Sequence, residues 1–134
     1  MTAVVADTHA IIWFLRNSQR LSDNAAAAMD SAIQANLPIH IASISLVEMV
    51  YLTERGKIPT AAFEQLMVTL DEPTSAFEVV PLDLTITLAL ASIDRATVPE
   101  MPDRIIAATA QSLGLPLVTR DHRIQNLSTL TTIW

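Results

Sequence analysis

The sequence predicts an α/β protein with three layers, in which a parallel sheet of about five short strands lies between helices. Short apolar runs alternate with amphipathic helical stretches along the whole chain, which is typical of a parallel sheet. The apolar runs show no polar alternation, as expected for strands covered on both faces. A chain of 134 residues is long enough for one domain with a sizeable core. We therefore expect a single domain over residues 1–134.

Five segments carry the strand pattern. The first is the apolar run at residues 3–6, which ends at Asp7, and the second follows Pro38. The expected strands are residues 3–6, 39–42, 77–81, 115–118 and 130–133.

Helical patterns fill the intervals between these strands. Ser22 and Asp23 form a helix start before an alanine-rich stretch, and Gly56 and Gly114 are helix stops. The expected helices are residues 10–15, 25–35, 43–52, 60–70, 83–95, 103–113 and a short one at 123–127. In the helix at 83–95, the spacing predicts Leu84, Leu88 and Ala91 as the core face.

The composition excludes several classes. A hydrophobic content of 51% argues against disorder, and two glycines cannot supply a glycine-rich phosphate loop. The apolar runs are far shorter than the roughly 18 residues that a membrane span requires, and there is no signal-peptide pattern. There is no cysteine for disulfides or thiolate metal sites. We expect a cytoplasmic protein that does not bind a membrane.

The net charge of −6 does not exclude a polyanionic substrate. The chain has 14 acidic residues against eight Lys and Arg. If four of the acids line one metal site, the remaining 10 against eight give a charge of about −2, because bound metal ions offset the four. The acidity does exclude a broadly basic nucleic-acid-binding surface.

Four acids occupy equivalent positions in the expected fold. Asp7 and Asp121 follow apolar strands, whereas Glu48 and Asp103 lie in the opening turns of helices. In a parallel sheet all four could meet at the C-terminal edge, where such sheets place their ligands. Carboxylate oxygens suit Mg²⁺ or Mn²⁺, and such a site can position a water for attack on phosphorus. For each acid taken alone, a helix cap or a surface salt bridge is the alternative.

Four motifs, in their order along the chain, resemble those of the PIN-domain ribonucleases, specifically the VapC-type toxins of type II toxin–antitoxin pairs. They are A-D-T-H-A-I-I-W-F-L at 6–15, I-S-L-V-E-M at 44–49, P-D-R-I-I-A-A-T-A at 102–110 and L-V-T-R-D at 117–121. The final T-I-W at 132–134 is similar to the end of the D-T-H subgroup. The resemblance spans nearly the whole chain.

The resemblance implies a PIN-like fold and a Mg²⁺- or Mn²⁺-dependent endoribonuclease that hydrolyses RNA phosphodiester bonds. It also implies that Asp7, Glu48, Asp103 and Asp121 are both the metal ligands and the catalytic residues. Members of the subgroup often carry a further Asp just upstream of the P-x-D-R step. This chain has Glu100 there, and we leave Glu100 out of the metal set.

Three further side chains are candidates for a supporting role. Thr8 and Thr119 match family positions near the metal and could bind water or phosphate, or simply cap the chain turns. Arg104 could pair with carboxylates or with a phosphate. His9, on the strand-to-helix turn with Thr8, could cap the helix and is more often a structural residue than a general base. The charges available to contact phosphate are Arg16, Arg20, Arg55, Lys57, Arg120 and Arg123.

Two other functions fit the pattern less well. A PIN-like module could bind a partner without cleaving RNA, although all four acids are present. A phosphoacceptor or phosphatase α/β domain would need a late lysine at the pocket, and the only lysine is Lys57.

Two partners are expected besides RNA. Apolar positions beyond one stripe at residues 46–52 and 61–70 predict a two-fold homodimer, which the resemblance also suggests. The resemblance implies a cognate antitoxin whose C-terminal segment wraps the chain. We expect a basic residue of that segment, best an arginine, to enter the acidic pocket. Its apolar side chains should lie in a groove near Trp13 and Tyr51.

Overall fold

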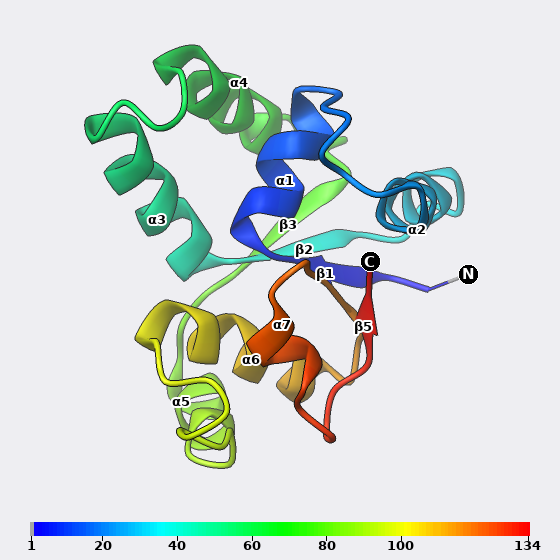
Figure 1. The fold of residues 1–134 in the computed structure, drawn as a ribbon. Helices are drawn as coiled ribbons and strands as arrows, with labels where there is room; N and C mark the ends of the chain where they lie inside the picture. Colours follow the sequence, from blue (N-terminus) through cyan, green and yellow to red (C-terminus); the bar gives the residue numbers. More distant parts are fainter. Residues whose placement is uncertain (1) are drawn as a thin grey trace.

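A five-stranded parallel sheet forms the centre of the computed structural model, which describes residues 2–134 (Figure 1). Every neighbouring pair of strands is parallel, and the strand order is β3-β2-β1-β4-β5. The strands are β1 (Val4–Ala6), β2 (Ile39–Ala42), β3 (Phe77–Val80), β4 (Leu117–Val118) and β5 (Thr132–Ile133). The expected fold class is confirmed, and each strand falls within a predicted segment.

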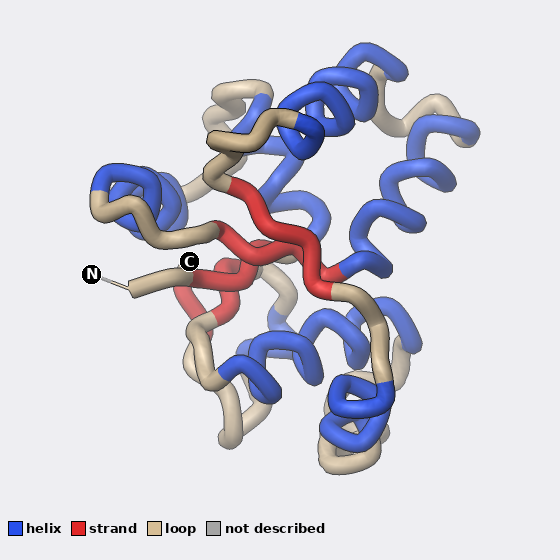
Figure 2. The backbone as a smooth tube through the Cα atoms, turned by 180° about the vertical axis from the view of Figure 1, so that it is seen from behind, coloured by secondary structure: helices blue, strands red, loops and turns tan. Residues whose placement is uncertain are grey.

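Seven helices cover the two faces of this sheet within the described residues (Figures 1 and 2). One layer packs through a core that includes Ile11, Met29, Met49 and Leu66. Its helices are α1 (Thr8–Leu15), α2 (Asp23–Gln34), α3 (Ser43–Glu54) and α4 (Thr60–Asp71). The other layer packs through a second core around Ile106. Its helices are α5 (Leu84–Leu90), α6 (Met101–Leu113) and α7 (His122–Gln125).

The first strand contributes to both cores, which explains its unbroken apolar sequence. Val4 and Ala6 belong to the core under α1 and α2, whereas Val5 belongs to the core under α6. All three side chains are fully buried because successive residues of a strand point to opposite faces. A polar residue at any of them would be placed inside one of the two cores.

The expected helix signals are found at the ends of the helices. Ser22 caps α2 by accepting a hydrogen bond from the amide of Ala25 at 3.1 Å. Gly114 ends α6 in the left-handed conformation, with φ of 66°, which glycine adopts without steric cost. The largest difference in the lengths concerns α5, which ends at Leu90 rather than continuing to residue 95.

The predicted core face of α5 is wrong. Leu84 and Leu88 are 72% and 66% exposed, and Ala91 is also exposed, while Ile86 and Ile93 are buried. The segment holds two apolar stripes, one on Leu84, Leu88 and Ala91 and the other shifted by two residues. Packing against α6 and its core selects the second stripe.

The connections at one edge of the sheet place the acidic residues. β1 ends directly before Asp7 and α1, and β2 ends directly before α3, which carries Glu48. β4 is followed by Thr119 and then by Asp121 at the start of α7. This is the C-terminal edge of the parallel sheet, where ligands of such folds bind.

None of the helices in residues 2–134 combines the length and the apolar character that crossing a membrane requires.

Candidate active site

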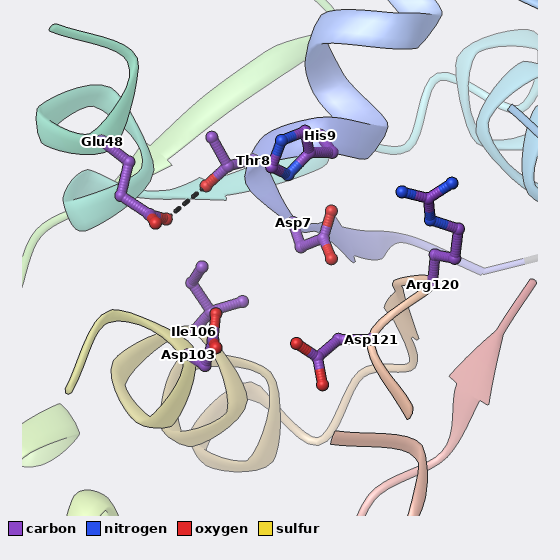
Figure 3. Close-up of a pocket in the computed structure, with 8 residues that line it drawn as sticks. All are labelled: Asp7, Thr8, His9, Glu48, Asp103, Ile106, Arg120 and Asp121. Carbon is purple, nitrogen blue, oxygen red and sulfur yellow. Dashed lines mark hydrogen bonds between the residues drawn. The ribbon is translucent and has the colours of Figure 1, made fainter. Parts of the chain in front are cut away.

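The four acids predicted from the sequence line one pocket at this sheet edge (Figure 3). The pocket has a volume of about 310 Å³. Asp7 precedes α1, Glu48 lies on α3, Asp103 lies in the first turn of α6, and Asp121 precedes α7. The side chains that complete the lining are Thr8, His9, Ile106 and Arg120. The structure therefore brings all four acids together from four different elements.

Asp7 has two roles in the structure. Its Oδ1 accepts a hydrogen bond from the amide of Ala10 at 3.0 Å, so Asp7 is the N-cap of α1. Its Oδ2 accepts a hydrogen bond from Thr119 Oγ1 at 2.5 Å. The expectation that Thr8 or His9 caps this helix is wrong, because both residues already lie inside its first turn. The cap and the pocket position are compatible, since they use the two oxygens of one carboxylate.

The two threonines hold the acidic side chains. The Thr8 hydroxyl donates a hydrogen bond to Glu48 Oε1 at 2.6 Å (Figure 3). This bond fixes the Glu48 side chain of α3 to the start of α1. Thr119 donates to Asp7 and accepts from the amide of Asp121 at 3.0 Å, so it links two of the acids. Both threonines are buried. Hydrogen bonds to a charged acceptor of this kind are stronger than neutral ones.

Asp121 caps the last helix. Its Oδ1 accepts hydrogen bonds from the amides of Arg123 and Ile124 at 2.8 and 3.1 Å. These bonds orient the carboxylate at the start of α7, beside the pocket that it shares with Asp7.

Burial and mutual repulsion raise the pKa of Asp7, Glu48 and Asp103. Desolvation is the main cause of the raised pKa of Asp7, and the hydrogen bond from Thr119 opposes it. Desolvation also raises the pKa of Glu48, against the hydrogen bond from Thr8. The pKa of Asp103 is raised to about 6, first by desolvation and then by the neighbouring charge of Asp121. A positive charge placed among these carboxylates would offset their mutual repulsion.

The donor set of the pocket fits a hard divalent cation. Carboxylate oxygens are the ligands that Mg²⁺ and Mn²⁺ prefer, and Mg²⁺ uses one or two of them while keeping several waters. Within residues 2–134, no group of three or more His, Asp or Glu side chains is arranged to hold an ion by itself.

Arg104 does not pair with the acids or line the pocket. Its Nη2 donates to the backbone carbonyl oxygens of Leu90 and Ile93, at 3.2 and 2.9 Å, so it ties α6 to the end of α5. The expected ion pair with the four pocket carboxylates is not formed, because the side chain turns toward the carbonyls that follow α5. Glu100 lies at the N-terminus of α6 and outside the pocket lining, although its charge raises the pKa of Glu48 and Asp103.

Two pocket residues were not predicted from the sequence. Ile106 lies one turn after Asp103 on α6, and the spacing of three residues on a helix was the available signal. Arg120 was only one of several candidate charges, and nothing in the sequence distinguished it from the others. Lys57 lies between α3 and α4 and does not line the pocket, so the lysine of a phosphoacceptor site is missing from it.

The fold and the pocket together define an α/β protein with a pocket of four acids at the C-terminal edge of its sheet. The PIN domain family model matches residues 4–130. The chain therefore belongs to the PIN domain family.

Similar proteins agree with this assignment. The chain is 28% identical to Ribonuclease VapC22 of Mycobacterium tuberculosis over 126 aligned residues. The alignment covers 94% of this chain and 92% of that protein. Its fold is similar to that of VapBC2 from Rickettsia felis bound to promoter DNA, with a TM-score of 0.72 and 18% identity over 98% of this chain and 97% of that one. It is also similar to DNA-bound VapBC from Salmonella typhimurium, with a TM-score of 0.67 and 22% identity over the same shares.

Proposed function

We propose that this protein is an endoribonuclease that hydrolyses RNA phosphodiester bonds with the help of Mg²⁺ or Mn²⁺. The observation that carries the proposal is the convergence of Asp7, Glu48, Asp103 and Asp121 on one pocket. Membership of the PIN domain family and the similarity to a protein named as a ribonuclease support it. We propose that residues 1–134 act as a single PIN domain.

We propose the same four acids as the metal ligands and catalytic residues. The pKa of Asp103, raised to about 6 by burial and then by neighbouring carboxylates, supports this role because a bound cation would offset that repulsion. When bound, Mg²⁺ or Mn²⁺ supplies charge neutralisation at the reacting phosphate and a water of lowered pKa. Asp7, Glu48, Asp103 and Asp121 would hold the ion through their carboxylate oxygens.

The protein's own residues position these groups. The hydrogen bonds from Thr119 and Thr8 hold Asp7 and Glu48, and the burial of both threonines restricts their movement. Such orienting contacts behind a metal ligand contribute to metal affinity and to activity. We therefore propose Thr8 and Thr119 as positioning residues. Arg104 has a structural role in joining α5 and α6.

We further propose that the protein is the toxin of a toxin–antitoxin pair. Two of the similar structures are VapBC complexes, and a third is described as a toxin–antitoxin complex from Klebsiella pneumoniae. The antitoxin would place an Arg or Lys among the four acids and replace the charge of the metal. A separate groove of about 490 Å³, lined in part by Trp13, Phe14 and Leu21, could receive its apolar side chains. Tyr51, which is 61% exposed on α3, does not line that hollow.

We also propose a homodimer. The helix α3 exposes Val47, Val50 and Tyr51, and α4 exposes Val68, although all four are apolar or aromatic. Covering such side chains by a second copy of the chain would stabilise the pair. Because α3 carries Glu48 into the pocket, a contact on its outer face would place two pockets on one assembly.

The test of the proposed function is cleavage of RNA by the purified protein. We expect cleavage in Mg²⁺ or Mn²⁺ that stops in excess chelator and returns when metal is restored. A protein that binds RNA and leaves it intact under all metal conditions would be a non-cleaving module. Cleavage that continues in chelator would rule out the metal-dependent mechanism.

A further inference from the structure

A second hollow adjoins the carboxylate pocket. It has a volume of about 520 Å³ and is lined by four consecutive residues, Arg120, Asp121, His122 and Arg123. Arg120 and Asp121 also line the carboxylate pocket, so the two hollows share a wall. An extended ligand bound in the carboxylate pocket can therefore continue into the adjoining hollow along the protein surface.

The second hollow concentrates positive charge in an acidic protein. Two of the eight Lys and Arg residues of the chain lie within these four positions, while the net charge is −6. Both arginines are exposed. The single acid among them, Asp121, is engaged by the amides of Arg123 and Ile124 at the start of α7. One carboxylate oxygen therefore stays with the backbone, and the four residues together carry two positive charges against one negative charge.

Arg120 is held in place by an aromatic ring. Its guanidinium carbon lies 4.5 Å from the centroid of the Trp13 ring, within the range of a cation–π contact. Trp13 is buried, and its ring packs against Trp134 at a centroid distance of 5.9 Å. Figure 3 shows the guanidinium turned away from Asp121 at the rim of the pocket. Stacking occupies the face of the guanidinium and leaves its N–H edge for an anion.

From these observations we infer that the hollow of Arg120 and Arg123 binds the phosphate next to the scissile one. The RNA backbone then passes from the carboxylate pocket across Arg120 toward α7. The inference rests on the proposed ribonuclease function and adds the path that the RNA backbone takes across the protein surface. It also explains how an acidic protein attracts a polyanion to four carboxylates, since Arg120 lines the pocket and Arg123 lines the adjoining hollow.

The experiment compares the Arg120→Ala/Arg123→Ala double variant with an Arg55→Ala control. Arg55 was one of the candidate phosphate contacts in the sequence, but it is exposed at the end of α3 and lines neither hollow, so its removal tests loss of charge alone. Cleavage of a short single-stranded RNA gives KM and kcat. Binding of the same RNA in chelator, measured by fluorescence anisotropy at several salt concentrations, gives a second readout without turnover. A third variant, Arg120→Lys/Arg123→Lys, keeps both charges.

For the double alanine variant we expect KM to rise about tenfold with little change in kcat, because each exposed contact contributes modestly. The slope of log affinity against log salt should fall by about 0.7, because one phosphate contact is lost. The double lysine variant should retain most of that slope, and Arg55→Ala should match the wild type.

Equal KM and equal salt slopes in the double alanine and Arg55→Ala proteins, with the wild type cleaving RNA, would overturn this inference alone. A wild-type protein that neither binds nor cleaves RNA would overturn the proposed function and this inference with it.

Discussion

Thr119 Oγ1 donates a hydrogen bond to Asp7 Oδ2 at 2.5 Å, across 112 residues of sequence. The same hydroxyl oxygen accepts from the amide of Asp121. One buried side chain thus connects the end of β1 to the end of β4 and sets the relative positions of two acids of the pocket. The arrangement of the acids depends on this contact as well as on the sheet.

Replacing Thr119 with valine should destabilise the protein. Valine has nearly the same shape but cannot donate to Asp7 or accept from Asp121, and a lost hydrogen bond to a charged group costs about 1.5–3 kcal/mol. Urea unfolding should show this loss for Thr119→Val, while Thr119→Ser, which keeps the hydroxyl, should lose less. If the valine variant is as stable as the wild type, the contact does not hold Asp7.

The metal-free protein should lose stability between pH 4 and pH 7 through Asp103. Its folded-state pKa of about 6 lies above the ordinary value of 3.8, so the folded protein binds this proton more tightly than the unfolded chain. The contribution is fully present below pH 4 and is lost as the pH rises through 6. After allowance for solvent screening we expect about 1–2 kcal/mol.

The measurement is the free energy of unfolding in chelator across this pH range, for the wild type and for Asp103→Asn. The difference between the two proteins should change with pH in favour of the variant as Asp103 ionises. Parallel pH curves for the two proteins would contradict the raised pKa.

The wild-type chain should sediment as a dimer at micromolar concentration. The Val47→Glu/Tyr51→Glu variant, which places charges on the outer face of α3, should be a monomer. Burying an unpaired charge in the dimer interface is costly. Ile33→Glu changes an exposed apolar residue on α2 and should leave the dimer intact. A wild-type protein that is strictly monomeric and fully active would rule the dimer out.

Inhibition by the antitoxin should weaken as Mg²⁺ or Mn²⁺ is raised. A basic side chain and a cation would compete for the same carboxylates, and the planar arginine fork suits paired acids best. Titration of the protein with its co-expressed partner at several metal concentrations gives the affinity. Substitution of the one basic residue by glutamine should weaken inhibition and remove its metal dependence. Full inhibition by a partner segment without any basic residue would contradict charge replacement.

The sequence predicted the parts of the fold that depend on local pattern. The buried strands at Val4–Ala6 and Ile39–Ala42 have no polar alternation, and Gly114 ends its helix where expected. The buried face of α5 could not be predicted from the sequence, because the segment holds two overlapping apolar stripes and only packing against α6 distinguishes them.

The candidate site was predicted as a set of residues but not as a network. The positions of Asp7, Glu48, Asp103 and Asp121 followed from strand ends and helix starts, together with the family resemblance. The partners of Thr119 and Arg104 did not, because both depend on contacts between elements far apart in sequence. The place of Arg120 over Trp13 is likewise a tertiary contact that no local spacing encodes.

The most direct test of the account is the rate of metal-dependent RNA cleavage by Asp103→Asn beside a matched Glu100→Gln control. Both changes remove one negative charge near the start of α6, but only Asp103 lines the pocket. We predict a loss of at least about 100-fold for Asp103→Asn, in line with the loss of a group that orients or binds a metal, and little change for Glu100→Gln. Wild-type cleavage by the folded Asp103→Asn protein, or equal losses in the two variants, would contradict the assignment of the four-carboxylate pocket as the catalytic site.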